Sequence, residues 1–115
     1  MDSINRSVAV IKPKQPLVDW LNSLPNTDPP FMLAVFQIDC TVILLPEYDS
    51  ENQTHKFIKK IYNEIFEKEL HSLCTDPSYW PSKRDYKTFL KWFSIVIHSE
   101  VFDTVDKAII KKQWD

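Results

Sequence analysis

Glycine is absent from the 115 residues of this chain, although average usage would give about eight. Dinucleotide-binding fingerprints, P-loops and kinase glycine loops all require glycine, because only glycine lets the backbone approach a phosphate closely. The nucleophile elbow, with its G-x-S-x-G pattern, requires glycine too. The sequence therefore excludes the best-known motifs of nucleotide binding and acyl transfer before any element is assigned.

The remaining composition indicates one globular domain that spans residues 1–115. A chain of this length buries roughly 65% of its unfolded surface, which is enough for a core without disulfides. The formal net charge of −2 lacks the basic excess of most nucleic-acid binders. No apolar run approaches the roughly 20 residues that span a bilayer, and the N-terminus lacks the apolar core of a signal peptide. We therefore expect a cytoplasmic protein with no membrane partner, in which Cys40 and Cys74 are reduced.

Three apolar runs, at residues 7–11, 41–45 and 93–102, predict strands. The first two runs are apolar at both odd and even positions, as in strands that are covered on both faces. In the third run one set of alternating positions is mainly apolar and the other is mixed, so we expect its second face to be only partly covered.

Capping and proline signals predict most of the helices. Pro16 suits the first turn of a helix that continues to Leu24 at helical apolar spacing. Ser50 and Gln53 form a capping-box pattern ahead of a long helix over residues 51–73. Asp85 caps a second, short helix that reaches residue 92 or 93.

Three further features are less direct. The apolar run at residues 31–38 fits a helix or a strand, and we predict a short helix. A last helix begins near Thr104, because acidic residues come first and lysines later, which matches the helix dipole. Glu69 projects into the apolar face of the long helix. We expect its carboxylate to reach water rather than to meet Arg84, a lysine or His98.

The predicted order is β-α-(α)-β-α-α-β-α, an α+β fold with a small three-stranded sheet packed by four to five helices. Long helical connections permit parallel pairing between the strands, but three strands do not determine the order of the sheet.

Four segments carry a resemblance to a known group of proteins. They are KPKQPLVDWLNSLP (12–25), DCTVILLPEYDSE (39–51), WPSKRDYKTFLKWF (80–93) and IHSEVFD (97–103). Together they cover much of the chain and resemble a small family of uncharacterised bacterial proteins. The resemblance implies a bacterial cytoplasmic protein, and it carries over neither an activity nor a site.

One candidate catalytic group combines a thiol, an imidazole and a carboxylate. Cysteine–histidine catalysis needs a thiolate, a nearby base and a group that orients the base. Cys74, His98 and Glu100 are the candidates for these roles, and His98 and Glu100 share one face of the third predicted strand. A partly buried histidine bonded to a carboxylate accounts for the same residues without catalysis.

A metal site is not predicted. The side chains that could bind a soft metal ion are Cys40, His55, His71, Cys74 and His98. His71 and Cys74 have the spacing of a zinc knuckle, but structural zinc sites usually contain two such close pairs. We therefore expect neither a metal nor another cofactor.

Charged residues follow the first two predicted strands. Lys12 and Lys14 come after the first strand, and Glu47 and Asp49 come after the second. If these strands are parallel, both loops lie at the carboxyl edge of the sheet, where α/β sheets usually bind ligands. Surface ion pairing between these residues is the simpler interpretation.

Aromatic and basic residues alternate between positions 79 and 93. Trp80, Arg84, Lys87, Lys91 and Trp92 are the candidate partner surface, because exposed tryptophan beside arginine is typical of protein interfaces. Aromatic rings among basic residues also suit single-stranded nucleic acid. Packing of both tryptophans within the fold is the alternative interpretation.

The leading prediction is a non-catalytic cytoplasmic binding or regulatory module whose partner is another protein. A small enzyme comes second, with Lys12, Lys14, Glu47, Asp49 or His98 at a sheet-edge site. A weak nucleic-acid binder comes third. The sequence identifies neither the partner nor the oligomeric state.

Overall fold

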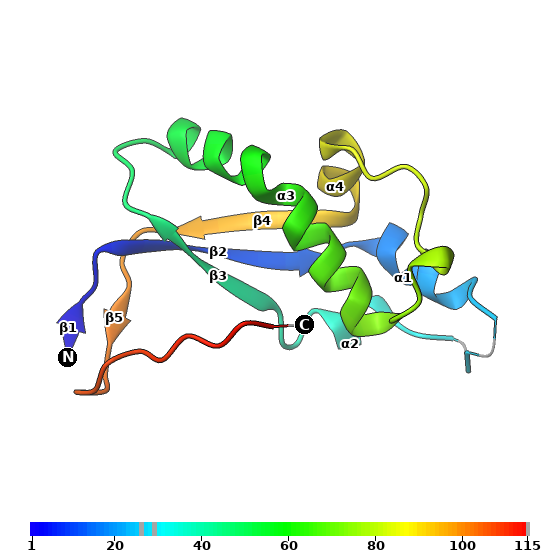
Figure 1. Ribbon diagram of the computed structural model, residues 1–115, viewed down its shortest axis with the longest axis horizontal. Coiled ribbons are helices and arrows are strands. Elements are labelled where there is room, and N and C mark those ends of the chain that lie inside the picture. The colour runs from blue at the N-terminus through cyan, green and yellow to red at the C-terminus, as the bar shows by residue number, and fades with distance from the viewer. Residues whose placement is uncertain (26, 29, 115) are drawn as a thin grey trace.

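The computed structural model of the protein describes residues 1–25, 27–28 and 30–114, and it confirms the predicted α+β class (Figure 1). The strands are β1 (Asp2–Ser3), β2 (Arg6–Pro13), β3 (Thr41–Pro46), β4 (Phe93–His98) and β5 (Phe102–Asp103). The helices are α1 (Gln15–Asn22), α2 (Leu33–Phe36), α3 (Glu51–Leu73), the 3₁₀ turn η1 (Pro77–Tyr79) and α4 (Tyr86–Trp92). Within the described residues, no helix combines the length and the apolar character needed to cross a membrane.

The main sheet has the order β3-β2-β4, and both neighbours run antiparallel to the central strand β2. Val10 of β2 lies opposite Val42 on one side and Val96 on the other. The two short strands β1 and β5 pair separately at one end of the molecule (Figure 1).

The lengths of the helices explain these strand directions. β2 extends over about 26 Å, whereas the 8 residues of α1 extend over only about 12 Å, so α1 does not return the chain to the start of β2. Residues 23–40, which include the short helix α2, do not return the chain along β2 either, so β3 begins where β2 ends and the parallel pairing considered from the sequence is wrong. α3, with 23 residues, is about 35 Å long and does return the chain, so β4 begins at the same end as β3.

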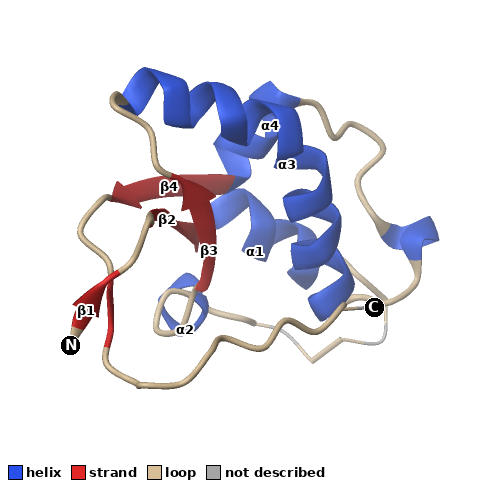
Figure 2. Ribbon diagram, turned by 60° about the vertical axis from the view of Figure 1, so that its left-hand side comes forward, coloured by secondary structure: helices blue, strands red, loops and turns tan. Residues whose placement is uncertain are grey.

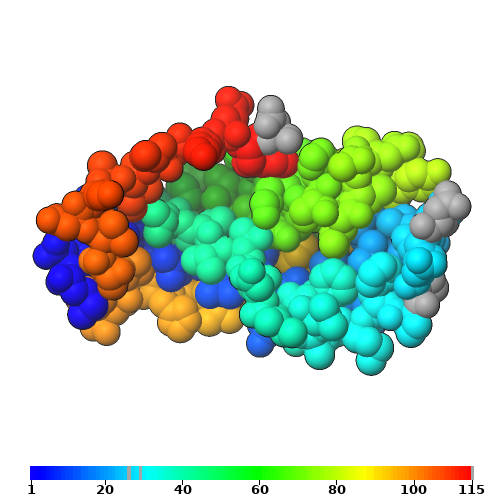
Figure 3. Space-filling view, turned by 90° about the horizontal axis from the view of Figure 1, so that it is seen from below, coloured from blue at the N-terminus to red at the C-terminus, as the bar shows by residue number. Residues whose placement is uncertain are grey.

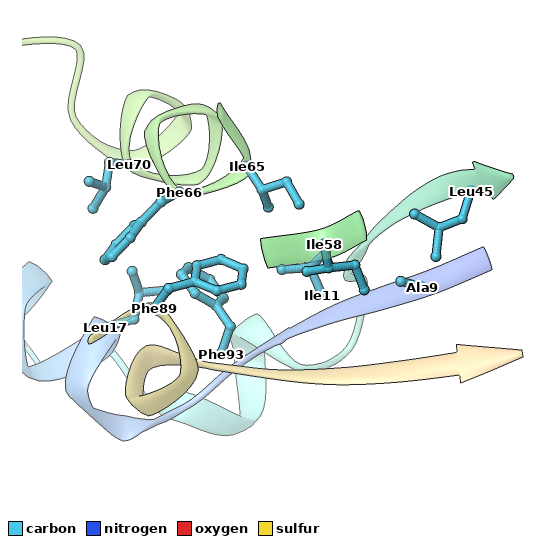
Figure 4. Close-up of a cluster of buried hydrophobic side chains, with 10 residues drawn as sticks. All are labelled: Ala9, Ile11, Leu17, Leu45, Ile58, Ile65, Phe66, Leu70, Phe89 and Phe93. Carbon is cyan, nitrogen blue, oxygen red and sulfur yellow. The ribbon is translucent and has the colours of Figure 1, made fainter. Parts of the chain in front are cut away.

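Helices α1, α3 and α4 lie on one side of the sheet (Figure 2). The core is a cluster of buried side chains between the two layers, and its members are Ala9, Ile11, Leu17, Leu45, Ile58, Ile65, Phe66, Leu70, Phe89 and Phe93 (Figure 4). Phe66 of α3 is fully buried, and its ring centroid lies 5.7 Å from those of both Phe89 and Phe93.

The two predicted N-caps are confirmed. The Ser50 hydroxyl accepts a hydrogen bond of 3.2 Å from the Gln53 amide, and α3 spans the predicted residues 51–73. The Asp85 carboxylate accepts a bond of 2.8 Å from the Thr88 amide at the start of α4. Each cap satisfies an amide that has no partner inside its helix, which fixes where the helix begins.

α4 passes into β4 without an intervening loop. Phe93 is both the residue that caps α4 and the first residue of β4, with extended dihedral angles of φ −136° and ψ 141°. Its amide donates to the Phe89 carbonyl, while its side chain is buried in the core. The junction needs no left-handed residue, which suits a chain without glycine.

Two C-terminal predictions are wrong. The third strand ends at His98 rather than at residue 102, and Phe102–Asp103 pairs with β1 instead. The predicted helix from Thr104 is absent, since residues 104–114 contain no helix. The Asp103 carboxylate accepts a bond from the Val105 amide, and the aliphatic side chains that follow stay largely exposed. A short helix with no buried face is unstable, which explains the difference.

We expect truncation of Phe66 to destabilise the protein strongly. Phe66→Ala removes a buried ring that contacts α4 and β4, and such changes lower the free energy of unfolding by about 3–5 kcal/mol. Phe102→Ala is the matched control, because Phe102 is half exposed, and it should cost less than about 1 kcal/mol. Urea denaturation followed by circular dichroism measures both. Equal losses in the two variants would contradict this description of the core.

We also expect the Asp85 cap to make stability depend on pH. The hydrogen bonds from Thr88 lower the pKa of Asp85 below its ordinary value of 3.8. The ionised cap therefore stabilises the folded state above pH 3.8, and this contribution is lost as the pH falls through the lowered pKa. Asp85→Ala should unfold at a lower temperature than the wild type at pH 7, with a smaller difference at pH 2.5. A difference that stays constant between the two pH values would exclude this role.

Candidate functional site

The charged loops after β2 and β3 lie at opposite ends of the sheet. Lys12 is at the end of β2 and Lys14 follows it, whereas Glu47 and Asp49 follow the end of β3 beside Arg6. Antiparallel pairing causes this separation, so the sheet-edge site suggested by the sequence is not assembled. The Lys14 ammonium instead donates to the Leu90 carbonyl over 2.9 Å near the end of α4.

The three candidate catalytic residues also lie apart. His98 ends β4, beside the β1–β5 pair, and both His98 and Glu100 are exposed. Cys74 follows α3, at the other end of the molecule (Figure 1). Its thiol lies 3.6 Å from the Asp76 carbonyl oxygen. Within the described residues, no three His, Cys, Asp or Glu side chains come together in a way that could hold a metal ion.

The predicted partner surface between Trp80 and Trp92 makes extensive contacts within the chain. The Trp80 indole donates to the Cys74 carbonyl over 2.8 Å, and the Arg84 guanidinium lies over the Trp80 ring at 5.8 Å. The Trp92 ring lies 5.5 Å from that of Phe66. Both tryptophans are half-buried against the core, whereas Lys87 and Lys91 remain exposed on α4.

The pKa shifts of ionisable groups in this segment also arise from neighbouring residues. Hydrogen bonds from Ser78 lower the pKa of Asp76, and burial raises the pKa of Tyr86. Each shift has a structural cause, the turn at Ser78 for Asp76 and the aromatic core for Tyr86.

The Glu69 carboxylate does not lie in water, contrary to the expectation from the sequence. The residue is only 9% exposed, and its Oε1 atom is buried without a hydrogen-bond partner. The nearest cation is the Lys68 ammonium, 3.9 Å away, which also donates to the Thr41 hydroxyl over 3.0 Å. The carboxylate therefore does not reach water freely, because this stretch of α3 faces a small cavity that is also lined by Ile11, Leu17 and Phe36.

The surface that the sequence analysis missed is the second face of the main sheet. Ala9 and Ile11 of β2 point into the core, and the alternate side chains point to the opposite side. On that side lie Val8, Val10, Val42, Leu44 and Val96, which we call the open face. Their cross-strand pairs are in register, Val8 with Leu44 and Val10 with both Val42 and Val96.

This open face is exposed to solvent in the described part of the chain. The exposed fractions are 56% for Val42, 48% for Leu44 and 38% for Val96. Seen from below, atoms of β2, β3 and β4 reach the surface between the end that carries β1 and β5 and the end that carries α2 (Figure 3). The signal was present in the sequence as strands that are apolar at both odd and even positions.

The molecule also has an apolar groove, which the chain itself partly covers. A groove of about 250 Å³ between β3 and α3 is lined by Ile43, Ile61 and Ile65 together with Trp114 of the C-terminal segment. The Trp114 ring also lies 5.8 Å from that of His71. The chain's own Trp114 thus lines this groove, and Leu44 of the open face lines it too.

The candidate site is therefore a mainly aliphatic surface on one face of the main sheet. The predicted resemblance to a bacterial family stays a prediction. Comparison with known proteins gives no further support for an assignment, since no family model, no curated protein and no solved structure matches the chain.

Proposed function

We propose that this chain is a non-catalytic cytoplasmic binding module whose partner is another protein that docks on the open face. The observation that carries the proposal is the row of aliphatic side chains across all three strands, which is exposed on β3 and β4 and half-buried on the central strand β2. Contiguous exposed apolar patches are rare on monomeric proteins and typically mark interaction sites. Burial of such a surface is also the dominant favourable contribution to most protein association.

The geometry favours a binding module over an enzyme. A catalytic centre needs a nucleophile, a base and its orienting group within hydrogen-bond reach. The candidates Cys74, His98 and Glu100 are spread between the two ends of the molecule. The open face presents mainly aliphatic side chains, which offer contact area, and its polar neighbours Ser94 and His98 lie opposite Lys12 and Val8, at different ends of β4.

We expect polar substitutions on the open face to abolish capture of a partner protein. Val42→Thr combined with Val96→Thr replaces two methyl groups with hydroxyls and keeps β-branched side chains, so the sheet should still form. Binding should weaken about tenfold or more, because the partner's apolar residues would then bury hydroxyl groups. Affinity capture from extracts of the source cells, quantified by mass spectrometry, measures the retained protein.

The matched control is Ile109→Thr combined with Ile110→Thr, which removes two exposed aliphatic side chains from the C-terminal segment. These variants should retain the same proteins as the wild type. If the open-face variant retains them equally well, or if the wild type retains nothing specific, the open face is not the docking surface.

A further inference from the structure

The three main strands contain no acidic residue. Their sequences are RSVAVIKP in β2, TVILLP in β3 and FSIVIH in β4. By strand alternation, Arg6 and Lys12 of β2 lie on the same side as Val8 and Val10, one beyond each end of the aliphatic row. The open face is therefore an aliphatic centre with a cation at either end, flanked on β4 by Ser94 opposite Lys12 and by His98 opposite Val8.

These two cations are not neutralised within the described part of the chain. The one ion pair found there joins Lys68 and Glu69 on α3. Arg6 donates only to its neighbour Asn5, over 2.8 Å to the carbonyl and 2.9 Å to the side-chain oxygen. Lys12 is exposed. Both charges are thus free to meet carboxylates on a partner.

From this arrangement, and resting on the proposed function, we infer that the partner presents an amphipathic helix with an aliphatic stripe and an acidic residue near each end. A helix is the element that covers the face of a sheet, whereas an added strand would pair with an edge. Two strand spacings give the sheet a width of about 10 Å, which matches the diameter of a helix.

The distance between Arg6 and Lys12 determines the distance expected between the two acidic residues of the partner helix. Arg6 and Lys12 are separated by six residues of extended chain, which is about 20 Å. A helix rises about 1.5 Å and turns about 100° per residue, so carboxylates about 14 residues apart match this distance and also lie near the same face of the helix. The intervening turns carry the aliphatic residues that cover Val8, Val10 and their cross-strand neighbours.

Two other occupants fit this surface less well. A second copy of the chain would bring a face with only cationic charges against an identical face, which is electrostatically unfavourable. Single-stranded RNA is usually bound by aromatic rings on a sheet face. The open face presents valine and leucine, and its strands place Phe93 in the core instead.

The test uses two synthetic helical peptides of 18 residues with the same leucine stripe. One carries glutamate at positions 3 and 17, near the face of the leucine stripe, and the other carries lysine at both. Fluorescence anisotropy with the full chain gives both affinities. At low salt the acidic peptide should bind about tenfold more tightly than the basic one, and salt should reduce this ratio.

Variants of the chain test which of its residues cause the preference for the acidic peptide. Arg6→Gln combined with Lys12→Gln should bring the affinity ratio close to one, whereas Lys87→Gln combined with Lys91→Gln, which removes two exposed charges from α4, should leave it unchanged. The double variant Val42→Thr, Val96→Thr should weaken both peptides. Circular dichroism confirms that each variant folds.

The outcomes separate the inference from the proposed function. Equal binding of both peptides, with loss in the Val42→Thr, Val96→Thr variant, overturns the acidic partner and keeps the docking face. No binding of either peptide overturns both. Concentration-dependent dimerisation that those threonine substitutions abolish assigns the face to a second copy, and preferential binding of a single-stranded RNA oligonucleotide assigns it to nucleic acid. Either result overturns the inference.

Discussion

The contact of Phe66 with Phe89 and Phe93 places the other elements of the fold relative to one another. The three rings belong to α3, α4 and β4, and their centroids lie 5.3–5.7 Å apart. Because α4 and β4 are continuous, holding Phe89 and Phe93 against α3 also determines where β4 meets β2. This aromatic cluster therefore joins the helical layer to the sheet at one end of a core that aliphatic side chains continue.

The same arrangement leaves the sheet with one helical layer. α3 is long enough to cross the sheet, while α1 and α4 fill the space beside it (Figure 2). Strands that are apolar on both faces normally lie between two covering layers. In the described chain the second layer is missing, and the proposed partner helix would take its place.

Local signals in the sequence predicted local structure well. Ser50 and Asp85 each provide a side-chain cap within three residues of the amide they bind, so the starts of α3 and α4 follow from short-range chemistry. The helix predicted from Thr104 had suitable charges but no apolar face that the fold could bury. Its failure shows that dipole-compatible charges alone do not make a short helix stable.

Long-range features were harder to predict. The direction of β3 depends on whether the connection between β2 and β3, residues 14–40, returns the chain along β2, and short-range patterns do not show the path of such a connection. The predicted sheet-edge site required β2 and β3 to be parallel. Because these strands are antiparallel, Lys12 and Glu47 lie at opposite ends of the sheet. The apolar strands predicted that both faces of the sheet are buried. Such a pattern does not show whether the second face is covered by the same chain or by a partner.

The direct passage from α4 to β4 also restricts how the length of this chain can change. Phe93 is buried, and the residues after it alternate between the core and the open face. One residue inserted after Phe93 would turn Ile95 and Ile97 outward and bring His98 toward the core, because a shift of one position reverses every side chain of a strand. An insertion between β4 and β5 would lengthen only an exposed connection. Natural variation in length should therefore be tolerated after residue 98 and excluded at residue 93.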